Sequence, residues 1–322
     1  MNNILITSAG RRVSLTNFFK NELKKIDSSA KVFALDAELQ LSAAAQIADC
    51  AFHISKVSGE NYIPDLLRIC LDNHIKLIIP TIDTELEILS INKDLFQERG
   101  INIVVSDREF IEVCNNKKMS HTFFEQNGIS VPNLYSKTAY KLPLFIKPVN
   151  GSSSKNNYLI WQEGDFLKTH FENDDLLFFE YIDHTSFDEF TCDAYYDQNS
   201  ILKCVIPRKR IEIRGGEVSK GLTKNNVLVD IIKNKLNPLR GARGCITMQF
   251  FVHKENKDII AIEINGRFGG GFPLSYLAGG NYPKWILEEY LLGKEIENFD
   301  NWEEDLLMLR YDSEILVHGY KG

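Results

Sequence analysis

Short apolar runs alternate with stretches of helical spacing in the first third of the chain. Apolar residues three and four positions apart predict amphipathic helices, and short apolar runs between them predict buried strands. The predicted strands are Ile4–Thr7, Lys31–Leu35, Ala51–Ile54, Leu77–Pro80 and Ile101–Val105, and the predicted helices are Val13–Leu23, Leu41–Ala48, Tyr62–Leu71 and Thr84–Phe96. Because this alternation is typical of a doubly wound parallel sheet, we expect a Rossmann-like α/β domain here.

The first predicted strand ends in the turn Thr7–Arg12, which is placed where a parallel sheet binds its ligands. The turn lacks the GxGxxG pattern of a dinucleotide site. The simpler interpretation, a turn that only starts the next helix, is therefore the one we adopt.

The remainder of the chain has mainly the pattern of antiparallel strands. A helix over Asn115–Asn127 precedes a hairpin of Leu144–Lys147 and Tyr158–Trp161, and Gly128 is well suited to end that helix. Further strands are predicted at Leu176–Glu180, Phe187–Tyr196, Ile201–Lys209, Cys245–Val252, Ile259–Ile264, Leu306–Leu309 and Ile315–Val317, and further helices at Glu163–Phe171, Val227–Leu236 and Pro283–Leu292. We expect three units, residues 1–113, 114–178 and 179–322.

Composition narrows the class of protein. With 44% hydrophobic and 25% charged residues, the 322-residue chain has the balance of a soluble globular protein. Its apolar runs are too short to span a membrane, no secretory signal is visible, and we expect a cytoplasmic protein. A net charge of -7 argues against a nucleic-acid partner. The six cysteines form no CxxC pair, which favours reduced structural thiols, and a homodimer is the expected assembly.

The segment from Ile262 to Gly271 carries the strongest chemical signal. Strand alternation places Glu263 and Asn265 on one face, with Ile262 and Ile264 on the other. Paired oxygen ligands of this kind suit Mg²⁺ carried on phosphates. Arg267 follows at the same step and would direct its donors at an anion beside the metal. The alternative is an amphipathic edge strand that ends in a glycine-rich turn.

A second candidate site begins at Lys147, at the end of an apolar strand. The loop after it contains Gly151, Ser152, Ser153 and Ser154, whose backbone amides and hydroxyls can surround phosphate oxygens while the lysine adds a positive charge. The alternative is a solvated hairpin tip.

The strand that ends at Glu180 is followed by the connector Tyr181–Ile182. An adenine base needs apolar faces and exposed backbone groups, and a connector of this kind offers both. Glu189 is placed to accept hydrogen bonds from ribose hydroxyls. Unpartnered surface carboxylates are the alternative for both glutamates.

The order of these groups along the chain resembles that of the ATP-grasp superfamily, and most closely its carbamoyl-phosphate-synthase-like and carboxylate–amine ligase branches. The resemblance covers essentially the whole chain. It implies a Rossmann-like domain, then an ATP-grasp fold made of a small α+β lid and a larger antiparallel catalytic part. It also implies ATP and Mg²⁺ as cofactors.

By the same resemblance each candidate residue acquires a role. Lys117, or the neighbouring Lys118, and Lys147 would bind the ATP phosphates beneath the flap Gly151–Ser154. Glu180, Tyr181 and Ile182 would hold adenine, and Glu189 would hold ribose. Glu263, Asn265 and Gln249 would bind Mg²⁺, with Gln249 standing where many relatives have an acid. Arg267 would stabilise the transferring phosphoryl group.

Two further departures from the family pattern bear on these roles. Asn156 stands where the flap usually ends in glycine, and because asparagine tolerates the left-handed conformation we expect the turn to survive. The link between hinge and ribose acid is long and lacks glycine, so Asp183 and Asp188 are alternatives to Glu189.

A basic cluster lies between the hinge and the catalytic strands. Alternation puts Arg208 and Arg210 on one face and Lys209 on the other. We expect the two arginines to face the cleft and to contact the γ-phosphate or the acid substrate. A solvated charged hairpin over this region is the alternative.

The resemblance implies an ATP-dependent ligase that joins a small carboxylate to an amine, with amino acids among the candidate substrates. Three alternatives stay open at this point. The chain could phosphorylate a carboxylate such as carbamate without forming an amide, it could be an ATP-binding regulatory protein without catalysis, or it could be a nicotinamide-dependent oxidoreductase. The missing GxGxxG pattern argues against the last.

Overall fold

The amino-terminal part is a parallel sheet flanked by helices. The computed structural model describes residues 2–151 and 156–320. The five parallel strands are β1 (Asn3–Ile6), β2 (Val32–Asp36), β3 (Cys50–His53), β4 (Ile75–Ile79) and β5 (Asn102–Ile103), in the order β3-β2-β1-β4-β5. The helices are α1 (Val13–Ile26), α2 (Ala43–Ile47), α3 (Tyr62–Asp72), α4 (Asp83–Ile91) and α5 (Lys93–Gln97). The predicted doubly wound domain is confirmed.

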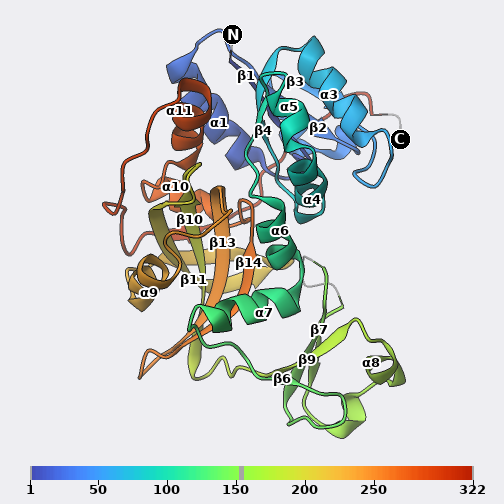
Figure 1. Ribbon diagram of the computed structural model, residues 1–322, viewed down its shortest axis with the longest axis vertical. Helices are drawn as coiled ribbons and strands as arrows, with labels where there is room; N and C mark the ends of the chain where they lie inside the picture. The colour runs from blue at the N-terminus through green and yellow to red at the C-terminus, as the bar shows by residue number, and fades with distance from the viewer. Residues whose placement is uncertain (1, 152–155, 321–322) are drawn as a thin grey trace.

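A small antiparallel sheet stands apart at the other end of the molecule (Figure 1). Its strands are β6 (Leu134–Tyr135), β9 (Leu176–Glu180), β7 (Leu144–Pro148) and β8 (Tyr158–Ile160), in that order, with helix α8 (Lys168–Glu172) beside them. The sheet has its own apolar cluster, which includes Ile146 and Phe178. Helices α6 (Arg108–Asn115) and α7 (Lys117–Gln126) connect it to the parallel sheet.

The largest sheet lies between these two and is antiparallel. Its strands are β14 (Ile259–Asn265), β13 (Gly244–His253), β10 (Phe187–Tyr196), β11 (Leu202–Arg214), β12 (Glu217–Thr223) and β15 (Leu307–Leu309), in that order. Helices α9 (Val227–Lys235), α10 (Phe272–Leu277) and α11 (Tyr282–Leu292) complete this part. The predicted fold class, a parallel-sheet domain followed by two antiparallel α+β parts, is confirmed.

One apolar core joins the parallel sheet to the largest sheet. Buried side chains from β1 and α1, such as Ile4 and Phe19, belong to the same cluster as Tyr195 of β10 and Trp285 of α11. Because the cluster is continuous, the parallel sheet and the largest sheet form one packed unit.

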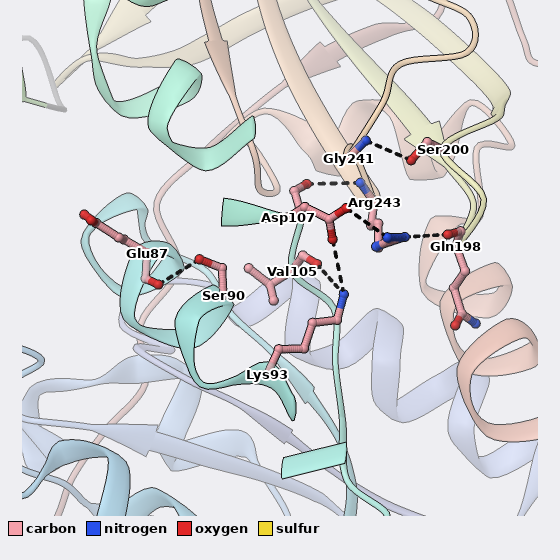
Figure 2. A network of polar contacts seen from close by, with 10 residues as sticks. Glu87, Ser90, Lys93, Val105, Asp107, Gln198, Ser200, Gly241 and Arg243 are labelled. Carbon is pink, nitrogen blue, oxygen red and sulfur yellow. Dashed lines mark hydrogen bonds and ion pairs between the residues drawn. The ribbon is translucent and has the colours of Figure 1, made fainter. Parts of the chain in front are cut away.

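Polar contacts reinforce the same junction (Figure 2). Asp107 lies between Lys93, whose Nζ is 3.9 Å from the carboxylate, and Arg243, whose Nη2 donates to it over 3.1 Å. Arg243 also donates to the Gln198 carbonyl. These contacts link α5 and the start of α6 to β13 and the β10–β11 turn.

Several predicted elements differ from those in the structure. No strand forms over Ile315–Val317, where the backbone pairs with nothing among the described residues, so that prediction is wrong. The single helix predicted over Thr84–Phe96 is two, because α4 ends at Ile91 and α5 starts at Lys93. Strands β6 and β12 and helices α6 and α10 were not predicted. The predicted unit boundaries fall inside α6 and β9, and the division into units stays a proposal.

Candidate active site

A cavity of about 460 Å³ is lined by residues of the small sheet, the largest sheet and the turn that follows β1. Strands β7 and β9 of the small sheet form one wall, β13 and β14 of the largest sheet form the other, and the turn after β1 reaches the same space. A volume of this size is typical of small-molecule sites. Lys147 and Glu263, 116 positions apart in sequence, both line it.

The register of β13 and β14 places the predicted metal ligands together. Glu263 is paired with Gln249 and Asn265 with Thr247, and all four side chains line the cavity. Directly opposite residues on antiparallel strands have neighbouring side chains. One predicted detail is wrong, because Ile262 also lines the cavity. A bulge causes this: Gln249 faces Glu263 but Phe250 faces Ala261, so Ile262 is the extra residue.

Two lysines lie near this carboxylate, Lys147 on β7 of the opposite wall and Lys117 at the start of α7. The pKa of Lys147 is lowered, mainly by burial and also by Lys117, while Glu263 and Glu189 oppose the change. Burial likewise lowers the pKa of Lys117 against the effect of Glu263 and Asp83. Both lysines therefore lie in the electrostatic range of Glu263. Lys118 is exposed and does not line the cavity, so Lys117 is the lysine that faces it.

The loop after β7 is described only at its ends. The Nζ of Lys117 donates to the Gly151 carbonyl over 3.1 Å, and Gly151 lines the cavity. Asn156 has φ +57°, the left-handed conformation expected of it. The predicted phosphate contacts Ser152, Ser153 and Ser154 lie outside the described residues.

The connector after β9 lines the cavity through Glu180, Tyr181 and Ile182. The Glu180 carboxylate accepts hydrogen bonds from the amide and side chain of Asn133, at 3.1 and 2.6 Å. Phe179 and Phe251 supply apolar surface nearby in the same lining. The connector therefore combines apolar faces with polar backbone, as a flat heterocycle requires.

Of the three candidate ribose acids, only Glu189 lines the cavity. Its carboxylate is 3.1 Å from Nε of Arg210. Asp183 accepts from the Thr185 amide, and Asp188 pairs with Lys209 at 2.8 Å on the other face of the sheet. Glu189 is therefore the one of the three that faces the cavity, and its role as the ribose acid stays a prediction.

Arg208 and Arg210 both line the cavity, as alternation predicted, but each has a carboxylate partner that the sequence did not indicate. Arg208 binds Asp193 with two hydrogen bonds of 2.8 and 3.1 Å, and both side chains are almost fully buried. Ser275 and Thr247 also donate to Asp193, at 2.6 and 3.3 Å. Arg208 is therefore held rigidly in place.

The glycines Gly269–Gly271 leave room for this arrangement. A Cβ at Gly271 would lie 2.2 Å from Nη1 of Arg208, and a Cβ at Gly270 would lie 2.4 Å from Cδ of Glu217. Any larger residue at either position would force the charged side chain to move. The glycine run after β14 is thus needed for close packing against Arg208 and Glu217.

Arg267 connects the candidate metal ligands to the parallel sheet. Its Nη2 donates to Asp83, at the start of α4, over 2.7 Å. Burial acts to lower the pKa of Arg267, but Asp83 and Glu263 outweigh it and the pKa is raised. The guanidinium therefore stays charged beside Glu263.

The sequence interpretation also missed charged groups in or beside the cavity, among them Arg11, Arg12, Asp83 and Glu217. The first two stand in the turn Thr7–Arg12, for which the sequence alone favours only the start of a helix. The strand order was the available signal, because β1 and β4 flank the point where it reverses and ligands bind there.

Comparison with known proteins agrees with this geometry. Residues 4–104 match the family model described as PylC-like, N-terminal domain, and residues 172–312 match that described as ATP-grasp in the biosynthetic pathway with Ter operon. The chain belongs to the ATP-grasp superfamily. The resemblance to this superfamily found in the sequence is thereby confirmed.

Individual relatives are distant. A carbamoyl-phosphate synthase of Methanobrevibacter smithii is 22% identical over 277 residues, which are 79% of this chain and 73% of that protein. The structure is similar to that of N5-carboxyaminoimidazole synthetase from Staphylococcus aureus complexed with ADP, with TM-score 0.71, 17% identity, and 96% and 82% of the two chains covered. It is also similar to L-amino acid ligase from Bacillus licheniformis, with TM-score 0.67, 15% identity, and 90% and 74% covered.

The donor set suits Mg²⁺ brought in by a nucleotide. Glu263, Asn265 and Gln249 offer side-chain oxygens, which are the ligands of this ion. In the described part of the chain, no three His, Cys, Asp or Glu side chains cluster closely enough to hold a metal by themselves. The nucleotide's phosphates would supply the other ligands.

Among residues 2–151 and 156–320, no helix is long and apolar enough to cross a membrane.

Proposed function

We propose that this enzyme is an ATP-dependent carboxylate–amine ligase, which forms an amide through an acyl phosphate and releases ADP and phosphate. The observation that carries the proposal is the shared cavity of Lys147 and Glu263. Lys147 provides a positive charge for phosphate oxygens, and Glu263 provides oxygen ligands for a metal on those phosphates.

In the first step a carboxylate oxygen attacks the γ-phosphorus of ATP, and the bond from that phosphorus to the β–γ bridging oxygen breaks. Lys147 and Lys117 neutralise the phosphate oxygens, and Arg267 faces the transferring group. Bound Mg²⁺, held by Glu263, Asn265 and Gln249, would neutralise charge that develops on the phosphates. The chain's contribution is positioning and charge stabilisation.

In the second step the amine nitrogen attacks the carbonyl carbon of the acyl phosphate. The carbon–oxygen bond to phosphate breaks, phosphate leaves, and the nitrogen loses a proton to give the amide. No nucleophile from the protein is required. Since an acyl phosphate reacts with water, the amine would have to capture it before water enters the cavity.

The adenine and ribose roles follow the same proposal. The connector Glu180–Ile182 would hold the base and Glu189 the ribose. Arg210, which pairs with Glu189, would hold that carboxylate in place. Arg208 would support the site through Asp193.

A second candidate reaction is phosphorylation of a small carboxylate or carbamate without amide formation. The similarity to a carbamoyl-phosphate synthase favours it. Both reactions share the first step, so they differ only in whether an amine captures the acyl phosphate. Chromatography of the reaction products would separate an amide from a released acyl phosphate.

The decisive test removes the carboxylate at the centre of the site. Glu263→Ala should abolish ADP release in a coupled assay with pooled acids and amines, while circular dichroism and the unfolding midpoint stay close to wild type. Glu255→Ala is the matched control, because Glu255 is exposed in the same β13–β14 hairpin but outside the cavity. Normal turnover by Glu263→Ala would contradict the metal assignment.

A further inference from the structure

The turn after β1 brings two arginines to the end of the cavity. It is rigidly held, since the Gly10 amide donates to Asp36 over 2.8 Å and the Ala9 amide donates to the Leu35 carbonyl over 3.1 Å. Gly10 has φ +47°, which glycine adopts without strain. Arg12 therefore projects from a fixed backbone.

Nearly every charged group around this turn has a partner. Arg267 pairs with Asp83 at 2.7 Å, and Glu217 pairs with Arg310 at 3.1 Å and with Arg11 at 3.7 Å. Arg12 differs. Among the described residues its guanidinium has no carboxylate within 4 Å, and its one hydrogen bond is a long one of 3.4 Å to the Thr81 carbonyl.

Arg12 is also partly buried, so water cannot fully solvate its charge. Its pKa is lowered, first by burial and then by Arg267 and Arg11, while Glu217 and Asp83 oppose the change. A bound anion would offset both the cost of burying the charged guanidinium and its repulsion from the neighbouring arginines. The geometry leaves space for one, because Arg12 lines the cavity.

Cations reach the cavity from different parts of the fold. Lys147 lies on β7 of the small sheet, and Arg12 lies in the turn after β1 of the parallel sheet. Arg267, which follows β14 of the largest sheet, pairs with Asp83 at the start of α4. Arg12 is therefore placed to contact a different part of the ligands than Lys147.

We propose that Arg12, with Arg11 beside it, binds a substrate carboxylate that is not the group phosphorylated by ATP. An arginine fork matches a carboxylate with two parallel hydrogen bonds. This inference rests on the proposed ligase function. The carboxylate belongs either to the acid substrate, which is then a dicarboxylic acid, or to the amine substrate, which is then an amino acid.

The test compares substrates with and without that carboxylate. ADP release is measured in two arms: dicarboxylic acids against their monoamides, with a pool of amines, and amino acids against their amides, with a pool of acids. In one of the two arms, conversion of the carboxylate to an amide should lower the kcat/KM of the wild-type protein roughly 10- to 100-fold, mainly by raising KM. That arm identifies which substrate carries the group.

Arg12→Ala should lower kcat/KM for the carboxylate substrate by a similar factor and should no longer distinguish it from the capped one. Arg12→Lys, which keeps the charge without the fork, should recover part of the discrimination. Arg68→Ala is the control, because Arg68 is exposed on α3 of the same parallel-sheet domain. It should leave both ratios unchanged.

The outcomes separate the inference from the function beneath it. Turnover with undiminished discrimination in Arg12→Ala would overturn the inference and leave the ligase function standing. Discrimination in neither arm by wild type would do the same. ADP release by wild type with none of the acid and amine pairs would overturn both.

Discussion

The two walls of the cavity hold their positive charges in different ways. On the largest sheet, Arg208, Arg210 and Arg267 each have a carboxylate partner, from Asp193, Glu189 and Asp83. Lys147 on the opposite wall and Lys117 at the start of α7 differ, because neither has a carboxylate within 4 Å in the described part of the chain. Lys117 donates to a carbonyl, and the Nζ of Lys147 lies 5.2 Å from the centre of the Phe145 ring.

This difference indicates that the arginines and the lysines have different roles in the site. A paired arginine is fixed before any ligand arrives, and its charge is largely neutralised. Burial disfavours the charged form of an unpaired lysine until an anion binds beside it. The largest sheet therefore supplies the framework of the site, and the lysines supply the free positive charge that phosphates can use.

The largest effect should come from breaking the most deeply buried pair. Asp193→Ala leaves Arg208 charged and without its partner in the interior, which should cost about 3–5 kcal/mol of unfolding free energy. Urea denaturation measures it. Asp188→Ala, which removes the more exposed pair with Lys209, should cost about 0–1 kcal/mol. Equal losses in the two variants would show that the buried pair is not a framework element.

Removing a free lysine should affect activity and leave stability nearly unchanged. Lys147→Ala should lower kcat/KM for ATP by about 10²–10³, since a preorganised positive group at the phosphates is lost. Steady-state kinetics with varied ATP measures this. Lys141→Ala, at an exposed position just before β7, is the control and should match wild type. A large loss of stability in Lys147→Ala would contradict the distinction between the two walls.

Asp83→Asn tests whether pairing keeps Arg267 in position. The amide retains the shape of the carboxylate but not its charge, so Arg267 should be held less firmly and kcat should fall by roughly tenfold. KM for ATP should change little, because Asp83 does not line the cavity. Asp94→Asn, exposed on α5, should have no effect. An unchanged kcat in Asp83→Asn would remove the positioning role.

The smallest expected effect is the uptake of protons when nucleotide binds. The pKa values of Lys147 and Lys117 are lowered in the free protein, and bound phosphates would raise them. Nucleotide binding should therefore take up a fraction of a proton at alkaline pH, and the affinity should fall as pH rises through the lowered pKa values. Calorimetry in buffers of different ionisation enthalpy measures the uptake. Lys147→Arg should reduce it, because arginine stays protonated.

The sequence supported the strand and helix pattern and the main candidate residues, because both depend on local periodicity. Glu263, Asn265 and Arg267 recur at every second position, and this was sufficient to place them on one face. The Ile262 bulge was not foreseeable in the same way. It depends on the register of β14 against β13, which no single segment contains.

The carboxylate partners of the arginines could not be predicted from the sequence for a related reason. Arg208 is paired across strands with Thr191, and its carboxylate comes from Asp193, two residues along β10. Such a diagonal contact appears only when the two strands are aligned. Asp83, at the start of α4, meets Arg267, which follows β14, across 184 positions of sequence. Long-range pairing of this kind leaves no local pattern.

The continuous apolar core between the parallel sheet and the largest sheet has a consequence for how the chain can be divided. Cutting between them would expose Phe19 on one piece and Trp285 on the other, so each piece would lose solubility as well as half of the cluster. The small sheet, which has a cluster of its own, is the segment that could be exchanged for that of a relative. Grafting experiments on this enzyme should therefore replace the small sheet and keep the other two together.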